Sequence, residues 1–195
     1  MTTYDEKTGQ NLIPAHGGYR GLKSYQSAEI IYDATVAFCD RFISPRSRTH
    51  DQMVQAARSG KQNIAEGSMA SGTSRKFEIK LVGVARASLE ELLLDCEDFL
   101  RQRRLQIWGR DNARAIEIRR LVYRSNKSYK TYKSYIEEKS PEIAANTLIC
   151  LINQANYLLD RQLRSLERRF LDEGGFTERL YNTRRRSRKN RYQGH

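Results

Sequence analysis

The chain has 195 residues, of which 38% are hydrophobic and 30% are charged, and its formal net charge is +12. This length suits one domain with a core of ordinary size, and a content of only three prolines favours an all-α fold. No apolar run is long enough to cross a membrane, and the first ten residues, MTTYDEKTGQ, lack a basic-then-apolar pattern. Neither a membrane span nor a signal peptide is therefore expected, and the predicted location is cytoplasmic.

The first helix is expected over residues 24–43, after an irregular lead-in over residues 1–23 that contains Pro14 and Gly17-Gly18. Apolar residues recur along it at steps of three and four, which places them on one face of a helix. Ser24 could cap its start. Ser44-Pro45 is expected to end it, because proline restricts the residue before it and cannot continue a helix.

The stretch over residues 52–100 has the clearest pattern in the chain. It predicts two helices, over residues 50–71 and 74–104, joined by the turn SMASGTS at residues 68–74. Thr49 could cap the first of them, and Thr73 or Ser74 the second. So short a turn makes the two helices antiparallel neighbours, and the long apolar stripe favours a bundle. That stripe in the second helix is Phe77, Leu81, Val84, Ser88, Leu92, Cys96 and Phe99.

An insert over residues 105–139 interrupts the long helices. Ala113–Tyr123 could form a short helix with Ile116, Ile118 and Leu121 partly buried. The sequence RSNKSYKTYKSY follows, and its interleaved lysines and tyrosines predict an exposed linker or a small elaboration. Lysine can neutralise phosphate and tyrosine can stack on unpaired bases, while a solvated loop is an equally good interpretation. The residues concerned are Lys127, Lys130 and Lys133, with Tyr129, Tyr132 and Tyr135.

The last long helix is predicted over residues 141–172. Ser140, Pro141 and Glu142 supply an N-cap, a first-position proline and a first-turn acid, and Gly174 is expected to end the helix. Its amide side chains could lie at a helix–helix or subunit contact and set the register there. They are Asn146, Asn153, Gln154, Asn156 and Gln162.

The positive charge is concentrated outside the predicted long helices. Residues 1–100 and 140–175 each have a net charge of −1, whereas residues 101–139 carry +8 and residues 176–195 carry +6. Such a distribution favours a polyanionic partner, most naturally nucleic acid, although a surplus that only aids solubility is the alternative. In the tail over residues 176–195, Phe176, Leu180 and Tyr181 could hold the first part down, and the rest is expected to be disordered until it meets a partner.

The candidate nucleic-acid-binding residues follow from this distribution. They lie at the end of the third helix, in the insert and in the tail. The arginines that end the third helix have a competing structural explanation, since cations favour the C-terminal end of a helix dipole. The candidates are Arg101, Arg103, Arg104, Lys127, Lys130, Lys133, Arg184, Arg185, Arg186, Arg188, Lys189 and Arg191.

The search for catalytic or metal-binding motifs is negative. There is no phosphate-cradling glycine loop, no HExxH, no GxSxG and no Cys/His cluster, so no cofactor, metal or enzymatic activity is expected. The acids between Glu90 and Asp98 lack the ExxH partner of a di-metal bundle, and they are expected to face solvent or basic residues of another subunit. Cys39, Cys96 and Cys150 are widely spaced and predict reduced core thiols.

Several stretches resemble the four-helix bundle protein family named for proteins encoded in intervening sequences of ribosomal RNA genes. The most specific are RSGKQNIAEGS (58–68) and ARASLEELLLDCEDFL (85–100), and residues 24–42, 73–81 and 146–167 also fit. The resemblance covers about four-fifths of the chain. The chain is similar to the longer members of the family, because it has a Lys/Tyr/Arg insert and a basic tail.

This resemblance implies an antiparallel, up-down four-helix bundle, with the basic insert between helices three and four, that assembles into a homopentamer. It also implies kinship with the accessory variability determinant of diversity-generating retroelements, which binds a reverse transcriptase and nucleic acid. No catalytic residues carry over. Asn63 and Glu66 could bond across helices or to a neighbouring subunit, and Gly67 could end the second helix. The expected partners are thus RNA or single-stranded DNA and a reverse transcriptase, and the alternative is a structural or protein-interaction bundle.

Overall fold

The structure is a computed structural model that describes residues 16–123 and 127–192, with only the backbone described at residues 186, 187 and 189–192. Every regular element in these ranges is helical, which confirms the all-α class. Most of the lead-in lies outside the described residues. The elements are η1 (Tyr19–Gly21), α1 (Lys23–Phe42), α2 (Arg48–Ala70), α3 (Arg75–Gln102), α4 (Ala113–Leu121), η2 (Tyr129–Thr131), α5 (Lys133–Glu137), α6 (Pro141–Glu173) and α7 (Phe176–Tyr192).

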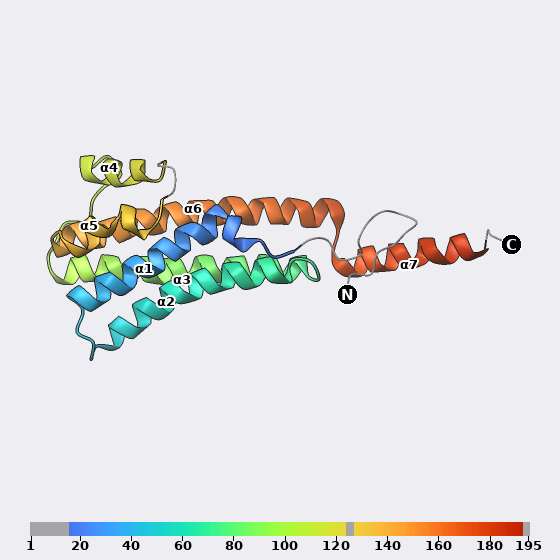
Figure 1. The fold of residues 1–195 in the computed structure, drawn as a ribbon, viewed down its shortest axis with the longest axis horizontal. Coiled ribbons are helices and arrows are strands. Elements are labelled where there is room, and N and C mark those ends of the chain that lie inside the picture. The colour runs from blue at the N-terminus through green and yellow to red at the C-terminus, as the bar shows by residue number, and fades with distance from the viewer. Residues whose placement is uncertain (1–15, 124–126, 193–195) are drawn as a thin grey trace.

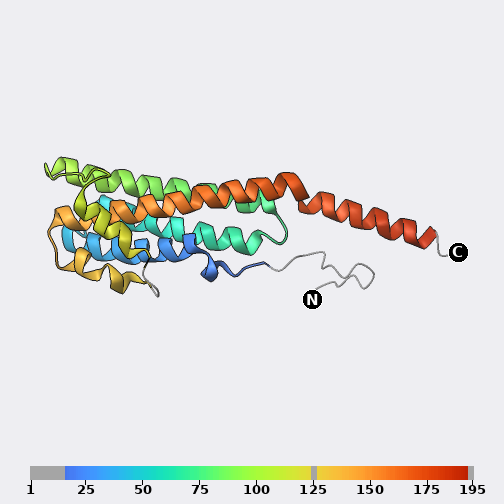
Figure 2. The same cartoon turned by 90° about the horizontal axis from the view of Figure 1, so that it is seen from above.

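Four long helices, α1, α2, α3 and α6, lie side by side and enclose the hydrophobic core (Figure 1). Each packs on two of the others: α2 on α1 and α3, and α6 on α1 and α3. The short helices α4 and α5 lie against α6 at one end of the molecule, and α7 projects from the opposite end (Figures 1 and 2). The insert and the tail are therefore separated along the whole length of the molecule.

Local signals at two helix starts are confirmed. The Ser74 hydroxyl accepts a hydrogen bond from the Phe77 amide, and the Ser140 hydroxyl accepts one from the Ile143 amide, with Pro141 in the first turn. Each serine satisfies a backbone donor that the helix itself leaves unpaired. The end of α6 is also as predicted, because Gly174 follows it in the left-handed half of the Ramachandran plot at φ 66°.

The predicted caps of the first two helices are wrong. Helix α1 begins at Lys23, and Ser24 lies inside it, where its hydroxyl donates to Gln162 Oε1 of α6 at 2.6 Å. Helix α2 is capped by Ser47, which accepts from the Thr49 amide. At α1 the N-cap position is Leu22, which makes no side-chain capping bond, because the Ser24 hydroxyl is used in the contact with α6.

The close packing of α2 on α3 depends on two glycines. A Cβ built on Gly60 would lie 2.7 Å from Leu89 Cδ2, and one on Gly67 would lie 3.4 Å from the Glu78 carbonyl oxygen. Gly67 does not end the helix, contrary to the prediction, since α2 continues to Ala70. Its role is to let the backbone of α3 approach.

The predicted stripe of α3 is only partly buried. Phe77 and Val84 are 47% and 41% exposed, and Ser88 is half-buried. Helix α3 packs on α2 and also on α6, so its buried arc is wide and is rotated towards α6. Residues on the far edge of the predicted stripe are thus left at the surface. The buried residues of α3 are Glu78, Leu81, Val82, Ala85, Leu89, Leu92, Leu93, Cys96, Phe99 and Leu100.

The lysine- and tyrosine-rich part of the insert is a small folded elaboration, which is one of the two predicted alternatives, and the other, an exposed linker, is wrong. Tyr132 is 1% exposed and Ile136 is fully buried, so both belong to the core. The Arg41 guanidinium of α1 donates to the Ile136 and Lys139 carbonyls and ties this segment down. Helix α4 is close to the prediction, with Ile118 and Leu121 buried.

All three cysteines are free and buried. Burial raises the pKa of the Cys39 thiol to about 12 and that of Cys150 to about 11, and it raises the pKa of Cys96 well above its usual value. The thiolate is the nucleophile, so both access and ionisation are suppressed. We expect a thiol reagent at pH 8 to label none of them quickly in the native protein and all of them in denaturant. Rapid labelling of the native protein would contradict this placement.

Candidate nucleic-acid interface

The arginines at the end of α3 differ in how they are held. Arg101 is paired with Asp98 at 2.7 Å. The Arg103 guanidinium carbon lies 3.8 Å from the centroid of the Phe99 ring, in a cation–π contact that still leaves the residue exposed. Arg104 is exposed and has a positive φ of 55°, where the chain turns out of the helix. Arg103 and Arg104 are thus the two cations of this group that are available to an external anion.

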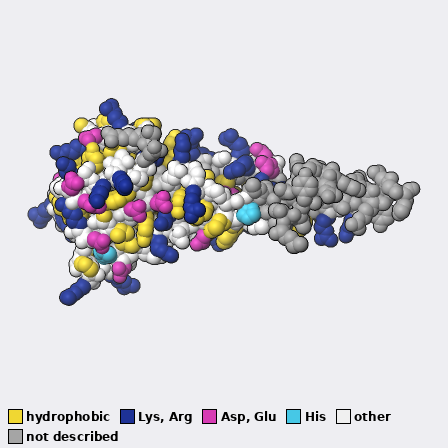
Figure 3. All heavy atoms as spheres, in the orientation of Figure 1, with side chains coloured by type: hydrophobic (Ala, Val, Ile, Leu, Met, Phe, Trp, Pro, Cys, Tyr) yellow, Lys and Arg dark blue, Asp and Glu magenta, His cyan; other side chains and the backbone are white. Residues whose placement is uncertain are grey.

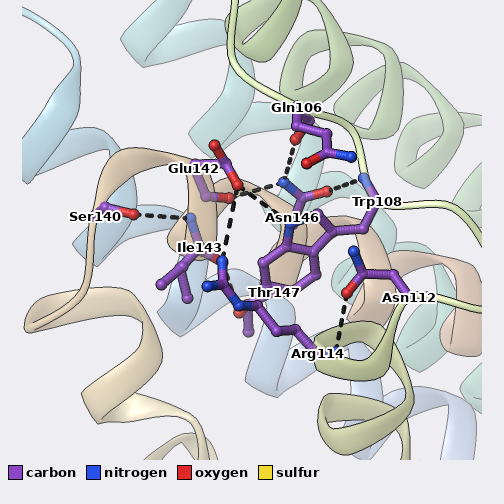
Figure 4. A network of polar contacts seen from close by, with 9 residues as sticks. All are labelled: Gln106, Trp108, Asn112, Arg114, Ser140, Glu142, Ile143, Asn146 and Thr147. Carbon is purple, nitrogen blue, oxygen red and sulfur yellow. Dashed lines mark hydrogen bonds and ion pairs between the residues drawn. The ribbon is translucent and has the colours of Figure 1, made fainter.

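A polar network anchors the loop that follows these arginines (Figure 4). Asn146, 1% exposed on α6, accepts a hydrogen bond from the Trp108 amide at 2.8 Å and donates to the Gln106 and Glu142 carbonyls. The Trp108 indole donates to Glu142 Oε1 at 3.3 Å, and the Arg114 guanidinium lies 4.0 Å from the same oxygen. This network fixes the α3–α4 loop against the first turns of α6, so the basic end of the molecule is a rigid surface.

Helix α4 adds basic residues that the sequence analysis did not select. Its N-cap, Asn112, accepts from the Arg114 amide, and its Ala115, Ile118 and Leu121 are buried. Arginines in α4 and in the turn before it lie at the same end of the molecule as Arg103 and Arg104, because α4 and the end of α3 lie together there (Figure 1). Counting charge over residues 101–139 contained this signal, but the helical spacing of these residues was not used. They are Arg110, Arg114 and Arg120, which are exposed, and Arg119, which is half-buried.

The lysines of the insert are unequal. Lys127 is half-buried and donates to the Val122 carbonyl, and its pKa is lowered by burial and by the neighbouring charge of Lys23. Lys133 lies 3.6 Å from Glu137 in an ion pair, and Lys130 is exposed. Lys127 lines a cavity of about 740 Å³ together with Arg20 of η1 and Lys23 at the start of α1. Lys130 is therefore the most accessible of the three predicted lysines.

The tyrosines of the insert are not arranged for base stacking as predicted. The core position of Tyr132 removes it from any external base. The Tyr129 hydroxyl donates to Glu137 and the Tyr135 hydroxyl donates to Glu117, and both residues are half-buried. Packing in the insert requires apolar surface, and these rings supply it.

The basic tail is a helix rather than a disordered segment. Among its predicted residues, Arg184, Arg185 and Arg188 are exposed on α7, and no ion pair holds them in the described part of the chain. The side chains of Arg186, Lys189 and Arg191 lie outside the described residues. An abundance of arginine is compatible with helix, and no hydrophobic residue occurs between Tyr181 and Tyr192, so α7 has no continuous apolar stripe.

Four of the five amide side chains of α6 form hydrogen bonds inside the chain, although the buried Oδ1 of Asn156 has no partner among the described residues. Besides Asn146, Gln154 donates to the Arg119 carbonyl, Gln162 accepts from Ser24, and Asn156 donates to Glu90. The amides therefore serve helix–helix contacts within one chain, as one of the two predicted alternatives proposed. Of the NIAEG stretch, Asn63 donates to the Ser59 carbonyl of its own helix.

The described ranges contain no cluster of three or more side chains suited to metal ligation, and none of their helices is both long and apolar enough to span a bilayer. The acids of α3 pair within the chain at two positions, Glu90 with Arg86 and Asp98 with Arg101. No protein-family model, no curated protein and no solved structure matches this chain.

Proposed function

We propose that this protein is a non-catalytic accessory scaffold that binds RNA or single-stranded DNA through arginines and lysines displayed at both ends of an antiparallel, up-down four-helix bundle. It acts with a reverse transcriptase and its template RNA in mutagenic cDNA synthesis, as the accessory variability determinant of a diversity-generating retroelement. The bundle supplies rigidity, and the insert and the tail supply contacts to phosphate. The proposal rests on the family resemblance of the NIAEG and ARASLEELL stretches and on the positions of the exposed cations.

One observation carries the proposal. Cations outside the core are exposed at both ends of the molecule, and several of them have no ion pair among the described residues: Arg104, Lys130, Arg184, Arg185 and Arg188. Unpaired surface arginines cost little in water and gain most when phosphates replace their counterions. If these cations served to stabilise the fold, they would form ion pairs with acidic side chains of the same chain.

The test is a titration of the full-length chain against fluorescent single-stranded RNA and DNA at several salt concentrations. Binding that weakens steeply with salt and depends little on sequence is the expected result. Absence of binding by the intact protein at low salt would contradict the proposal. Gene neighbourhood is an independent check, because a reverse transcriptase gene with a template repeat nearby is expected.

A second candidate function is a structural bundle whose partner is another protein. It is favoured by apolar residues at the surface, including Met69 and Phe77 at the α2–α3 turn. A shallow groove of about 540 Å³ also lies between α3 and α6, lined by Ile79, Leu163 and Phe170 among others. Such apolar patches often mark protein interfaces.

The same apolar surface supports self-association, and we propose a closed ring, with five copies as implied by the family resemblance. Light scattering at micromolar concentration is expected to give a single oligomer of that mass. Phe77→Glu is expected to weaken it by placing a charge where the interface excludes water, while Lys80→Glu, an exposed neighbour on the same helix, serves as control. A monomeric wild-type protein would overturn the ring.

A further inference from the structure

Helix α6 carries a stripe of cations that the charge count along the sequence conceals. Tyr157, Arg161, Arg164 and Arg168 are all exposed and follow one another at steps of four, three and four, so they lie on one face of the helix. We call these four residues the α6 stripe. It extends about 16 Å along the helix axis.

The segment over residues 140–175 has a net charge of −1, yet its acids are mostly used elsewhere. Asp160 pairs with Arg86 of α3 at 2.8 Å, Glu173 pairs with Arg75 at 2.5 Å, and Glu142 belongs to the Trp108 network. The arginines of the stripe have no ion pair among the described residues. Three of the five acids of this segment are therefore engaged by other residues, while Glu167 and Asp172 stay exposed on α6 beside the three arginines of the stripe.

The stripe lies between the two basic ends of the molecule. Helix α4 reaches α6 at Gln154, which donates to the Arg119 carbonyl at 3.2 Å, and the stripe begins within one turn, at Tyr157. After Arg168 the chain passes through Gly174 into α7. Separate groups of lysine and arginine side chains lie along the upper edge of the molecule, over α4 and over α6, with acidic side chains near the far end of α6 (Figure 3).

Tyr157 gives the stripe a feature that a row of arginines alone would lack. Its side chain is 62% exposed, and the Arg161 guanidinium carbon lies 5.9 Å from its ring centroid. An exposed ring beside a guanidinium can stack on an unpaired base while the arginine contacts the adjoining phosphate. A base inside a duplex offers no face for such stacking, so the combination favours a single strand.

We propose that the α6 stripe binds the sugar–phosphate backbone of a single nucleic-acid strand and carries that strand from the α4 end of the molecule towards α7. This inference rests on the proposed function and adds to it a binding surface and a path. It places a binding surface on the four-helix bundle itself, between the insert and the tail. The sequence analysis had assigned binding only to the end of the third helix, the insert and the tail.

The test compares two variants with the same loss of charge. R161Q/R164Q/R168Q removes the stripe, and R46Q/R48Q/R58Q removes three exposed arginines from α2 and the connector before it. For a single-stranded RNA and a DNA of the same sequence, the slope of log K against log salt is expected to fall by about 2 in the stripe variant. In the matched control variant, the slope is expected to fall by less than half as much.

The outcomes separate the inference from the proposed function. If the wild-type protein binds and both variants lose equal slope, the effect is one of net charge and the stripe is not a site. An unchanged slope in the stripe variant would also show that the stripe is not a binding site. Failure of the wild-type protein to bind any strand contradicts the proposed function itself. Circular dichroism confirms that each variant is folded.

A second measurement concerns Tyr157. Tyr157→Ala is expected to reduce the preference for single strands over duplex several-fold, and Tyr157→Phe is expected to retain it, because stacking requires the ring and not the hydroxyl. Equal preference in both variants and the wild-type protein would remove the stacking role. A preference for duplex in the wild-type protein would overturn the single-strand assignment.

Discussion

Deletion of residues 184–195 is expected to weaken binding to single-stranded nucleic acid uniformly across sequences and to flatten its salt dependence. The deleted segment contains six cations, Arg184, Arg185, Arg186, Arg188, Lys189 and Arg191. If each neutralises one phosphate, the slope of log K against log salt falls by about 4 for a single strand. A closed ring would enlarge the change in affinity, since it presents several tails to one strand.

The deletion should leave the bundle intact. Helix α7 projects from the end of the four long helices, so its second half can be removed without exposing core (Figures 1 and 2). The melting temperature and the oligomeric state are expected to be unchanged, with a small loss of helical signal from the residues removed. Equal slopes for the full-length and shortened proteins would show that the tail touches no phosphate.

A substitution that keeps the length of α7 separates charge from helix. R184Q/R185Q/R188Q removes the three cations whose side chains are exposed on α7. It is expected to produce about half of the slope change of the deletion, or about 2. A full-sized effect from the deletion together with none from the substitution would assign the role to the rest of the deleted segment, which includes three further cations.

Asn146→Ala is expected to have the largest effect on stability of any amide substitution in α6. The side chain bonds the Trp108 amide and the Gln106 and Glu142 carbonyls from a position that is 1% exposed. Its removal leaves the buried Trp108 donor unpaired, at a cost of about 2–3 kcal/mol in the free energy of unfolding. For a chain of this size the melting temperature should fall by roughly 5–10 °C.

Trp108 provides the readout, because it is the only tryptophan in the chain. Loss of the anchor should expose its indole and move its fluorescence emission to longer wavelength. Asn153→Ala is the matched control, since Asn153 is an exposed amide two turns further along the same helix. Its effect is expected to stay within about 0.5 kcal/mol. Equal stability of the two variants would show that the network does not hold the loop.

Much of the local structure could be predicted from the sequence. The spacing of apolar residues located the long helices to within a few residues, and the all-α class followed from them. Ser140 was identified as a cap and Ser74 as one of two candidates, because a capping serine is recognisable from a few adjacent residues, whereas the caps predicted for the first two helices were wrong. The cysteines were also placed correctly in the core.

The burial of residues in the insert could not be predicted from the sequence. Tyr132 stands in a sequence that alternates lysine with tyrosine, which is typical of an exposed segment, and it is nevertheless buried with Ile136. Tyr132 is covered by side chains from other helices. The twelve residues around Tyr132 in the sequence therefore do not reveal that it is buried. The same holds for Gly67, which ends no helix and whose role depends on the approach of α3.

The sequence by itself determined where the four long helices lie and that positive charge is concentrated in two segments, because these properties depend on spacing and composition. Only the tertiary structure decided which arc of each helix is buried, since that depends on the number and direction of its neighbours, as Val84 demonstrates. It also decided which charges are neutralised: Arg86 and Arg75 pair with acids of α6, whereas Arg161, Arg164 and Arg168 form no ion pair among the described residues. Charge counted along a chain is additive, whereas charge at a surface depends on which residues meet across helices, so the α6 stripe could be recognised only in the folded protein.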